Sequence, residues 1–368
     1  MNLEKRGIRS LKPRWSSRAF QSTVLAMSAT LALTACAATS TPAAPEAPAD
    51  DPVVIGVAMK TQLQERWAFD VASMQAEADA QGATLIVQYA DDDATLQASQ
   101  VENLLSQGID VLIMVPVDDK AAAASANAAN AAGVPVISYD IGVQGVAVDA
   151  FVIRNNPQVG VLQAETCLAA TGGTGNYVQI WGDAANDVAQ AISIGQSATL
   201  EGTEANVLYA DFNKNWDPAT AQATAENLLT ANNDDIKAFL TANDGMAGGV
   251  IQALQGRGLG GKVCVTGLDA TPTALKFILQ DLMTMSVWTP IDKQAQLAVQ
   301  AALALANGEE IAATTTTDNG SGAEIPTIQV PVEAITKDKV CDFVRTIAPE
   351  GWVKAEDVFE DISVCPAN

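Results

Sequence analysis

The chain has 368 residues, of which 48% are hydrophobic and 17% charged, and its 43 acidic and 20 basic side chains give a net charge of −23. This length exceeds the roughly 250 to 300 residues at which a single core stops growing, so two domains are expected. The hydrophobic content excludes disorder as the main state, and the negative charge argues against nucleic acid as a partner. The chain contains no histidine, which excludes Ser/His/Asp and Cys/His catalysis and the usual zinc sites.

Residues 1–35 predict an export signal. Basic residues precede an apolar stretch from about Ala19 to Leu33 that is too short for a comfortable membrane span. The stretch ends in the sequence LTAC, which resembles the lipobox of bacterial lipoproteins, and the resemblance implies that Cys36 is lipidated. A chance cysteine beside an ordinary cleavage site is the alternative. Residues 36–52 are rich in Pro and Ala and are expected to be a linker between lipid and fold.

From residue 53 onward, apolar runs alternate with helical patterns. The first series predicts strands at 53–59, 84–90, 111–117 and 134–140, with helices at 67–81, 96–107 and 120–132 between them. The strands are almost continuously apolar, as parallel strands buried on both faces require. Right-handed crossovers would then place helices on both faces of a doubly wound sheet.

A second series with the same plan follows the stretch 151–155, where the chain is expected to change lobes. It predicts helices at 158–170, 185–200, 218–230 and 245–255, and strands at 176–182, 206–212, 236–244, 262–269 and 283–290. We therefore expect an α/β protein of two similar doubly wound parallel-sheet lobes. The N-terminal lobe is assigned to 53–154 and the C-terminal lobe to 155–289, and about 290–320 is expected to return to the first lobe.

Polar and aromatic residues gather where the predicted strands end. Ligands of open parallel sheets bind beyond the carboxyl ends of the strands. The candidate binding residues there are Lys60, Arg66, Trp67, Asp140, Asn186, Trp216, Asn243 and Asp269. Taken singly, the acids and amides could be helix caps, the tryptophans core residues and the arginine a solvated side chain. Their recurrence at one topological position favours a sugar site, because aromatic rings stack on C–H faces while polar groups bond hydroxyls.

Four cysteines follow Cys36, and an exported chain permits disulfides. Cys341 and Cys365 bracket a C-terminal segment that a disulfide could hold. Cys167 and Cys264 lie in apolar stretches, and we expect them to be small buried hydrophobic residues. Spacing alone fixes no pairing.

Several segments carry a family resemblance. GVAMKTQLQERW, VISYD, ENLLTANND, TANDGMAGGVIQALQGRGLGGKV, GLDAT and VWTPI are similar to segments of the periplasmic sugar-binding proteins of ABC importers, and within them the chain resembles the xylose-binding group. The resemblance runs from about Val53 to past Pro331. It implies the type I fold, in which two lobes joined by a hinge close on one monosaccharide, with residues 321–368 near the hinge. It also implies a monomer without cofactor or metal that delivers its ligand to a permease and its ATPase.

The resemblance assigns roles by motif. Arg66 and Trp67 match the family's Arg-Trp pair, Asp140 its Tyr-Asp acid, Trp216 its stacking tryptophan, and Asn243 and Asp269 its hydroxyl partners in the second lobe; Asn186 falls near an acid of its loop. The family's xylose binders carry Arg, Arg and Lys where this chain has Ile141, Ser193 and Thr289. Lys60 stands where the family often has an acid. Loss of three donors predicts an altered selectivity, because unpaired hydroxyls are costly.

We therefore expect a non-enzymatic receptor that captures a monosaccharide or polyol on the periplasmic or extracellular face and contacts the membrane only through a lipid anchor. One alternative is a sensor that is read by a membrane receptor for chemotaxis or signalling. Another is a secreted hydrolase with paired carboxylates, Asp183 with Asp187 or Asp269.

Overall fold

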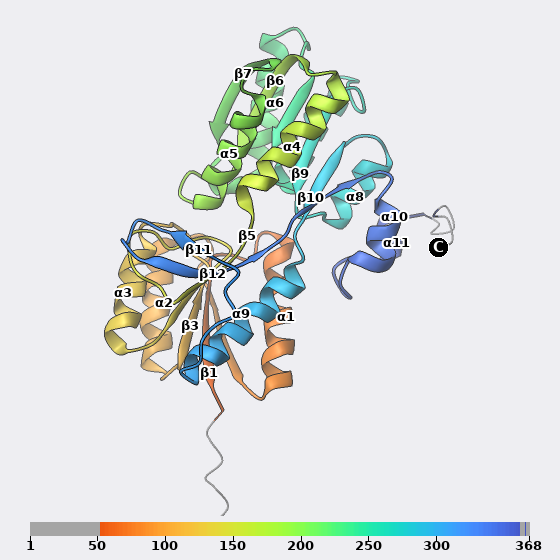
Figure 1. Cartoon of the computed structure of the whole chain (residues 1–368). Coiled ribbons are helices and arrows are strands. Elements are labelled where there is room, and N and C mark those ends of the chain that lie inside the picture. The colour runs from red at the N-terminus through yellow and green to blue at the C-terminus, as the bar shows by residue number, and fades with distance from the viewer. Residues whose placement is uncertain (1–51, 361–364, 366–368) are drawn as a thin grey trace, which may run out of the picture. The chain divides into compact units, whose positions relative to one another are not determined.

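The computed structural model describes residues 52–360 and Cys365. The predicted signal peptide, Cys36 and almost all of the predicted linker lie outside these residues. Within the described part, the chain forms two sheets whose central strands are parallel, each covered by helices (Figure 1). The predicted fold class, two doubly wound parallel-sheet lobes, is confirmed.

The first sheet has the strand order β11-β12-β5-β4-β3-β1-β2. Its strands from the N-terminal half are β1 (Val54–Met59), β2 (Thr84–Tyr89), β3 (Val111–Met114), β4 (Val136–Tyr139) and β5 (Ala150–Arg154), and its helices are α1 (Glu65–Gln81), α2 (Ala94–Ser106) and α3 (Ala122–Ala132). The side chains of β3 and β4 are buried on both faces, which agrees with the continuous apolar runs in the sequence.

The second sheet has the order β13-β10-β9-β8-β6-β7. Its parallel strands are β6 (Thr174–Trp181), β7 (Glu204–Phe212), β8 (Ala238–Thr241), β9 (Cys264–Leu268) and β10 (Met285–Trp288). Its helices are α4 (Asn156–Thr171), α5 (Asp187–Leu200), α6 (Pro218–Ala231), α7 (Asp244–Gly256) and α8 (Pro272–Leu279), with a short 3₁₀ turn, η1 (Lys214–Trp216). The helix α8 was not predicted from periodicity.

Short polar side chains fix where several helices begin. A side-chain oxygen at the N-cap accepts hydrogen bonds from the backbone N–H groups of the first turn, which otherwise have no partner. The residues that cap in this way are Asp93 for α2, Asn155 for α4, Asp217 for α6, Asn243 for α7 and Thr271 for α8. Because these caps directly follow strands or short loops, they also set the loops at the carboxyl ends of the sheets.

The C-terminal part of the chain returns to both sheets. Helix α9 (Ile291–Ala306) packs against α1 and against the first sheet. Strands β11 (Thr315–Asp318) and β12 (Glu324–Val330) extend the first sheet, whereas β13 (Glu333–Thr336) pairs antiparallel with β10 in the second. The short helices α10 (Val340–Asp342), the π-helical turn η2 (Phe343–Ile347) and α11 (Ala355–Val358) follow, and α10 and α11 contact α8. Over residues 52–360, no helix is both long and apolar enough to cross a bilayer.

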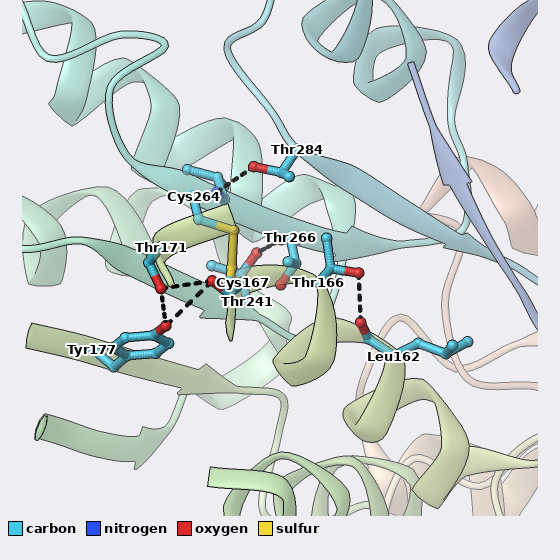
Figure 2. Close-up of a disulfide and its surroundings, with 10 residues drawn as sticks. Leu162, Thr166, Cys167, Thr171, Tyr177, Thr241, Cys264, Thr266 and Thr284 are labelled. Atoms are coloured by element: carbon cyan, nitrogen blue, oxygen red, sulfur yellow. Dashed lines mark hydrogen bonds between the residues drawn. A yellow bond between two sulfur atoms is a disulfide. The ribbon is translucent and has the colours of Figure 1, made fainter. Parts of the chain in front are cut away.

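Two disulfides join the four cysteines that follow Cys36. Cys341 is bonded to Cys365, which confirms the suspected pair. Cys167 in α4 is bonded to Cys264 at the start of β9 (Figure 2), so the expectation that these two are only small buried residues was wrong. Both are buried as expected, but their Cα atoms lie 5.6 Å apart, a separation that suits a disulfide. Sequence periodicity places each on an inner face without showing that helix and strand bring them together.

Replacing both Cys167 and Cys264 by Ser should lower the free energy of unfolding by about 2–5 kcal/mol, because the bond closes a loop of 97 residues in the unfolded chain. Urea denaturation of the oxidised wild type and the double variant measures this difference. Reduced wild type is the control for reagent effects, and an unchanged urea midpoint in the variant would contradict the prediction.

Candidate ligand-binding site

A pocket lies where the carboxyl ends of the two sheets meet. Its lining from the first lobe is Lys60, Gln64, Arg66, Trp67, Asp140, Ile141 and Arg154, and its lining from the second lobe is Val188, Trp216, Asn243, Leu268 and Asp269. All the predicted binding residues except Asn186 therefore line one pocket. Side chains separated by more than two hundred residues converge here because the loops after parallel strands lie at the same edge of each sheet.

Arg66 is the central charge of the pocket. It lies in the first turn of α1, is 3% exposed, and pairs with Asp70 on the same helix at 3.1 Å and with Asp140 after β4 at 2.9 Å. Asp269, from the second lobe, is its third acidic neighbour at 3.8 Å. Burial alone would lower the pKa of Arg66, but Asp140, Asp70 and Asp269 together raise it, so the guanidinium stays charged.

The contact between Arg66 and Asp269 is incomplete. Arg66 Nη1 and Asp269 Oδ1 are the two atoms separated by 3.8 Å, which is too far for a hydrogen bond. Both atoms are buried without a hydrogen-bond partner in the described structure. Burial raises the pKa of Asp269, and the nearby guanidinium groups of Arg66 and Arg154 counteract the rise only in part. A buried donor and a buried acceptor thus face each other across a gap between the lobes.

Asp140 is held by two cations. Arg66 Nη2 and Arg154 Nη1 each lie 2.9 Å from its Oδ2, and Gln294 Nε2 of α9 donates to the same oxygen at 3.2 Å. Burial would raise the pKa of Asp140, but the guanidinium groups of Arg154 and Arg66 outweigh it and hold the pKa below its usual value. The carboxylate is therefore ionised and fixed in orientation.

Trp67 and Trp216 supply the aromatic surface. Trp67 is nearly buried, its Nε1 donates to Gln64 Oε1 at 2.8 Å, and the guanidinium carbon of Arg66 lies 4.5 Å from its ring centroid. Trp216 is half-buried, and its Nε1 donates to Asn186 Oδ1 at 3.0 Å. A Cβ atom at Gly182 would lie 2.2 Å from the Trp216 ring, so glycine is required there for the ring to approach the backbone.

Asn186 does not line the pocket as predicted, and Asn243 lines the pocket but also caps a helix. Asn186 is fully buried and does not line the pocket; besides holding Trp216, its Nδ2 donates to the Val117 carbonyl of the first lobe at 3.0 Å. Asn243 lines the pocket, but its Oδ1 caps α7 by accepting from Met246 N. The cap and the ligand contact are thus compatible for Asn243, because its Nδ2 amide is the atom that would donate to a ligand.

Lys60 and the three departures from the family pattern can now be located. Lys60 is buried and paired with Asp92 at 2.9 Å. Ile141 lines the pocket, whereas Ser193 lies outside it and donates to the Gln190 carbonyl. Thr289 is fully buried, and its Oγ1 has no hydrogen-bond partner in the described structure.

The sequence reasoning missed several pocket residues, above all Arg154. Arg154 ends β5 and binds both Asp140 and the side chain of Asn156. A charged residue directly after the apolar run AFVI could have indicated a site residue. The stretch was interpreted only as a connection between the lobes. Gln64, Val188 and Leu268 were also missed. Gln64 lies in a short loop, Val188 in a helix and Leu268 in a strand, and nothing in the sequence around them shows that they meet in one pocket.

Several strained backbone positions lie at or beside the site. Asp140, Asn215, Trp216 and Asp269 have φ angles of 62°, 57°, 56° and 106°, a region that side-chain-bearing residues rarely adopt. Such conformations persist only where the surroundings determine them, and they cluster at functional sites. At Asp140 the strain accompanies a carboxylate that Arg66, Arg154 and Gln294 orient. At Asp269 it accompanies a carboxylate whose nearest cation is Arg66 at 3.8 Å.

A second group of contacts joins the lobes beside the pocket. Asp119 N donates to Ala185 O at 2.9 Å, and Gly142 N donates to Asp187 Oδ1 at 2.9 Å. Asp183 accepts from the backbone N–H groups of Ala185 and Asn215. Neither Asp183 nor Asp187 lines the pocket, so neither carboxylate pair of the hydrolase alternative, Asp183 with Asp187 or Asp183 with Asp269, lies there.

Comparison with known proteins agrees with this geometry. A model of the periplasmic binding protein domain matches residues 55–310, and the chain therefore belongs to that family. The D-xylose-binding periplasmic protein of Escherichia coli K12 is 32% identical over 310 residues, which are 83% of this chain and 92% of that protein. The predicted resemblance to periplasmic sugar-binding proteins, the xylose-binding group among them, is confirmed.

Solved structures show the same fold. A carbohydrate transporter solute-binding protein of Chloroflexus aurantiacus in complex with D-glucose is 28% identical with a TM-score of 0.76, over 84% of this chain and 99% of that one. A solute-binding protein of Bacillus halodurans with bound myo-inositol is 28% identical with a TM-score of 0.70, over 79% and 96%. Family membership implies an exported binding protein, and it confirms the expectation that the chain is not an enzyme.

Asp244 makes the stability of the fold depend on pH. Its carboxylate accepts from Ser286 Oγ at 2.6 Å and from Thr271 N at 2.8 Å. Burial first, and then the negative charge of Asp269, raises the pKa of Asp244 from 3.8 to about 8. The folded chain thus keeps a proton that the unfolded chain releases near pH 4. Stability should therefore fall as the pH rises from about 4 to about 8.

We expect Asp244→Asn to reduce this pH dependence, because its amide does not titrate; part should remain, since burial raises the pKa of Asp187 to about 7. Urea denaturation at pH 5 and pH 8 measures the difference. Asp357→Asn, at an exposed position, is the matched control and should behave as the wild type. An Asp244→Asn variant with the full wild-type difference would show that Asp244 does not carry it.

Proposed function

We propose that the chain is the solute-binding component of an ABC importer and captures an uncharged monosaccharide or small polyol between its lobes. The observation that carries this proposal is the unpaired couple of Arg66 Nη1 and Asp269 Oδ1. A hydroxyl group can accept from the first and donate to the second at the same time. Sugars and polyols carry several such hydroxyl groups.

The couple also explains why a ligand would favour closure. Arg66 belongs to the first lobe and Asp269 to the second, so a hydroxyl that bonds both adds interactions only when the lobes are together. A ligand shifts a conformational equilibrium by its difference in affinity for the two states. The tryptophans Trp67 and Trp216 would cover C–H faces of the same molecule.

At one place in the pocket, two apolar side chains favour a part of the ligand that carries no hydroxyl group. Ile141 and Val188 line the pocket from different lobes, and their chain neighbours Gly142 and Asp187 are hydrogen-bonded to each other. The two apolar side chains therefore lie close to the same contact between lobes. A ligand hydroxyl placed against them would lose its bonds to water at a cost of about 1–3 kcal/mol. The proposed ligand presents C–H or methyl groups there, which separates this site from one with arginine at position 141.

Lipid anchoring through Cys36 is part of the proposal and rests on the sequence LTAC and the linker that follows it. The chain would then act at the outer face of the cell membrane, monomeric and tethered, and hand the sugar to its permease. Uptake of labelled sugar, measured with and without the gene, separates import from the alternative of signalling, which would leave uptake unchanged.

The mature chain should be stabilised by at least one member of a panel of pentoses, hexoses, deoxy sugars and polyols. A ligand at about 100 times its Kd adds about 2.7 kcal/mol, or a few degrees in Tm for a protein of this size. Thermal unfolding of protein refolded without sugar measures the shift. Between a hexose and its 6-deoxy counterpart, the deoxy sugar should shift Tm at least as much. No shift with any member would contradict the proposed ligand class.

Asp269→Asn and Asn243→Ala should each weaken sugar binding about tenfold or more, since each removes a buried polar partner of the ligand. Isothermal titration with the sugar that gives the largest Tm shift measures the loss. Asp235→Asn is the control, because Asp235 lies in the second lobe at an exposed position outside the pocket. Wild-type affinity in both site variants would place the ligand elsewhere.

A further inference from the structure

The last part of the described chain forms a small unit that reaches the site from outside the pocket. We call residues 340–360 with Cys365 the C-terminal segment. It lies beyond residues 55–310, which match the family model. The bond between Cys341 and Cys365 holds it together, and Arg345 Nη2 donates to the Cys365 carbonyl at 3.1 Å. Phe343 packs edge-on against Trp288 at the end of β10, with 5.0 Å between ring centroids.

Trp352 of this segment contacts both lobes. Its side chain is 6% exposed. In the second lobe, its ring lies 5.9 Å from that of Trp288, and its Nε1 donates to the Ala270 carbonyl at 3.2 Å. In the first lobe, it packs edge-on against Phe69 of α1, with ring centroids 5.4 Å apart. One indole thus joins the helix that carries Arg66 to the turn that carries Asp269.

The turn at Ala270 requires such support. Asp269 and Ala270 have φ angles of 106° and 50°, and two adjacent residues in this region are costly without glycine. Their backbone N–H groups are held by the Val287 carbonyl and by Ser286 Oγ. The Trp352 indole bonds the turn from its other side, at the Ala270 carbonyl. Loss of that bond leaves a buried carbonyl without its partner, and the bond from Thr271 N to Asp244 then holds this peptide unit from one side only. The turn that carries Asp269 would lose one of its restraints.

We propose that the C-terminal segment is part of the binding device: Trp352, held in place by the Cys341–Cys365 disulfide, positions Asp269 for the ligand and ties the two lobes together through Phe69. Trp352 does not line the pocket, so it is a positioning residue and not a ligand contact. The inference rests on the proposed sugar-binding function, but its effect on the turn at Asp269 is independent of any sugar.

Trp352→Phe tests the indole bond, because it keeps an aromatic ring and removes the N–H donor. Trp181→Phe is the matched control: Trp181 also lies in the second lobe and donates one indole hydrogen bond, to Gln196 Oε1 at 3.0 Å, outside the pocket. Titrations with D-xylose, D-glucose and myo-inositol should show at least a fivefold weaker binding for Trp352→Phe, mainly through faster dissociation, and wild-type binding for Trp181→Phe.

The two disulfides provide a second matched pair. Cys341→Ser with Cys365→Ser should weaken binding of the same sugars, whereas Cys167→Ser with Cys264→Ser should not. The control removes the longer loop, 97 residues against 24, and Cys264 begins the strand that leads to Asp269. An effect confined to the first pair is therefore not a general loss of stability. Equal loss of affinity in both pairs would overturn the proposal.

Hydrogen exchange in the sugar-free protein separates this inference from the proposed function. Amides of residues 267–271 should exchange faster in Trp352→Phe and in the Cys341/Cys365 double variant than in wild type or Trp181→Phe. Unchanged exchange in both variants overturns the positioning role whatever happens to affinity. If none of the three sugars binds the wild type, the proposed function fails for these sugars, and the exchange experiment alone decides the inference. If Trp352→Phe does not fold, the disulfide pair decides it.

Discussion

The guanidinium of Arg66, buried among Asp70, Asp140 and Asp269, is the interaction on which the rest of the site depends. A buried cation is tolerated only when nearby carboxylates compensate for the lost hydration, and each of these carboxylates comes from a different place in the fold. Asp70 follows on the same helix and also accepts from the Tyr139 hydroxyl, so helix α1 is fixed against the end of β4. Asp140 links the cation to Arg154 on β5 and to Gln294 on α9. β5, where the chain leaves the first lobe, and α9, where it returns, are thus both connected to Arg66 through Asp140.

This network has consequences for how the lobes meet. Around Asp187 and Asn186 the contacts between lobes are hydrogen bonds to backbone groups, such as those to Gly142 N and the Val117 carbonyl. Near α1 the contact is aromatic, between Phe69 and Trp352. Hydrogen bonds between polar groups can be exchanged for water at little net cost when the lobes separate. The incomplete contact of Arg66 with Asp269 also joins the lobes, and in the proposed function the ligand supplies its missing partner.

Much of this organisation can be read from the sequence, because parallel strands buried on both faces leave continuous apolar runs and because residues that line the pocket follow them. Arg66, Trp67, Asp140, Trp216, Asn243 and Asp269 were found in this way. What escaped depends on long-range packing: Arg154 meets Asp140 only through pairing of β4 with β5, and Cys167 meets Cys264 only because α4 packs against β9. Asn186 was placed correctly in its loop, but its side chain turns to Trp216 and Val117 and away from the pocket. The contacts of Trp352 with both lobes could not be predicted from the sequence for the same reason.

The charge balance of the site also limits what can occupy it. Arg66 and Arg154 face Asp70, Asp140 and Asp269, and Lys60 is already paired with Asp92. An anionic ligand such as a sugar acid would therefore meet two carboxylates in the pocket, Asp140 and Asp269, while Arg66 and Arg154 already compensate them. The desolvation of its charge would be poorly compensated. A neutral polyhydroxylated molecule needs no counter-ion, and one of its hydroxyl groups can bond both Arg66 Nη1 and Asp269 Oδ1, the unpaired donor and acceptor that face each other. Ile141 lines the pocket where the family resemblance implies an arginine, so it adds no further cation to this charge balance. The altered selectivity that we predict and the uncharged ligand that we propose thus have a common physical basis.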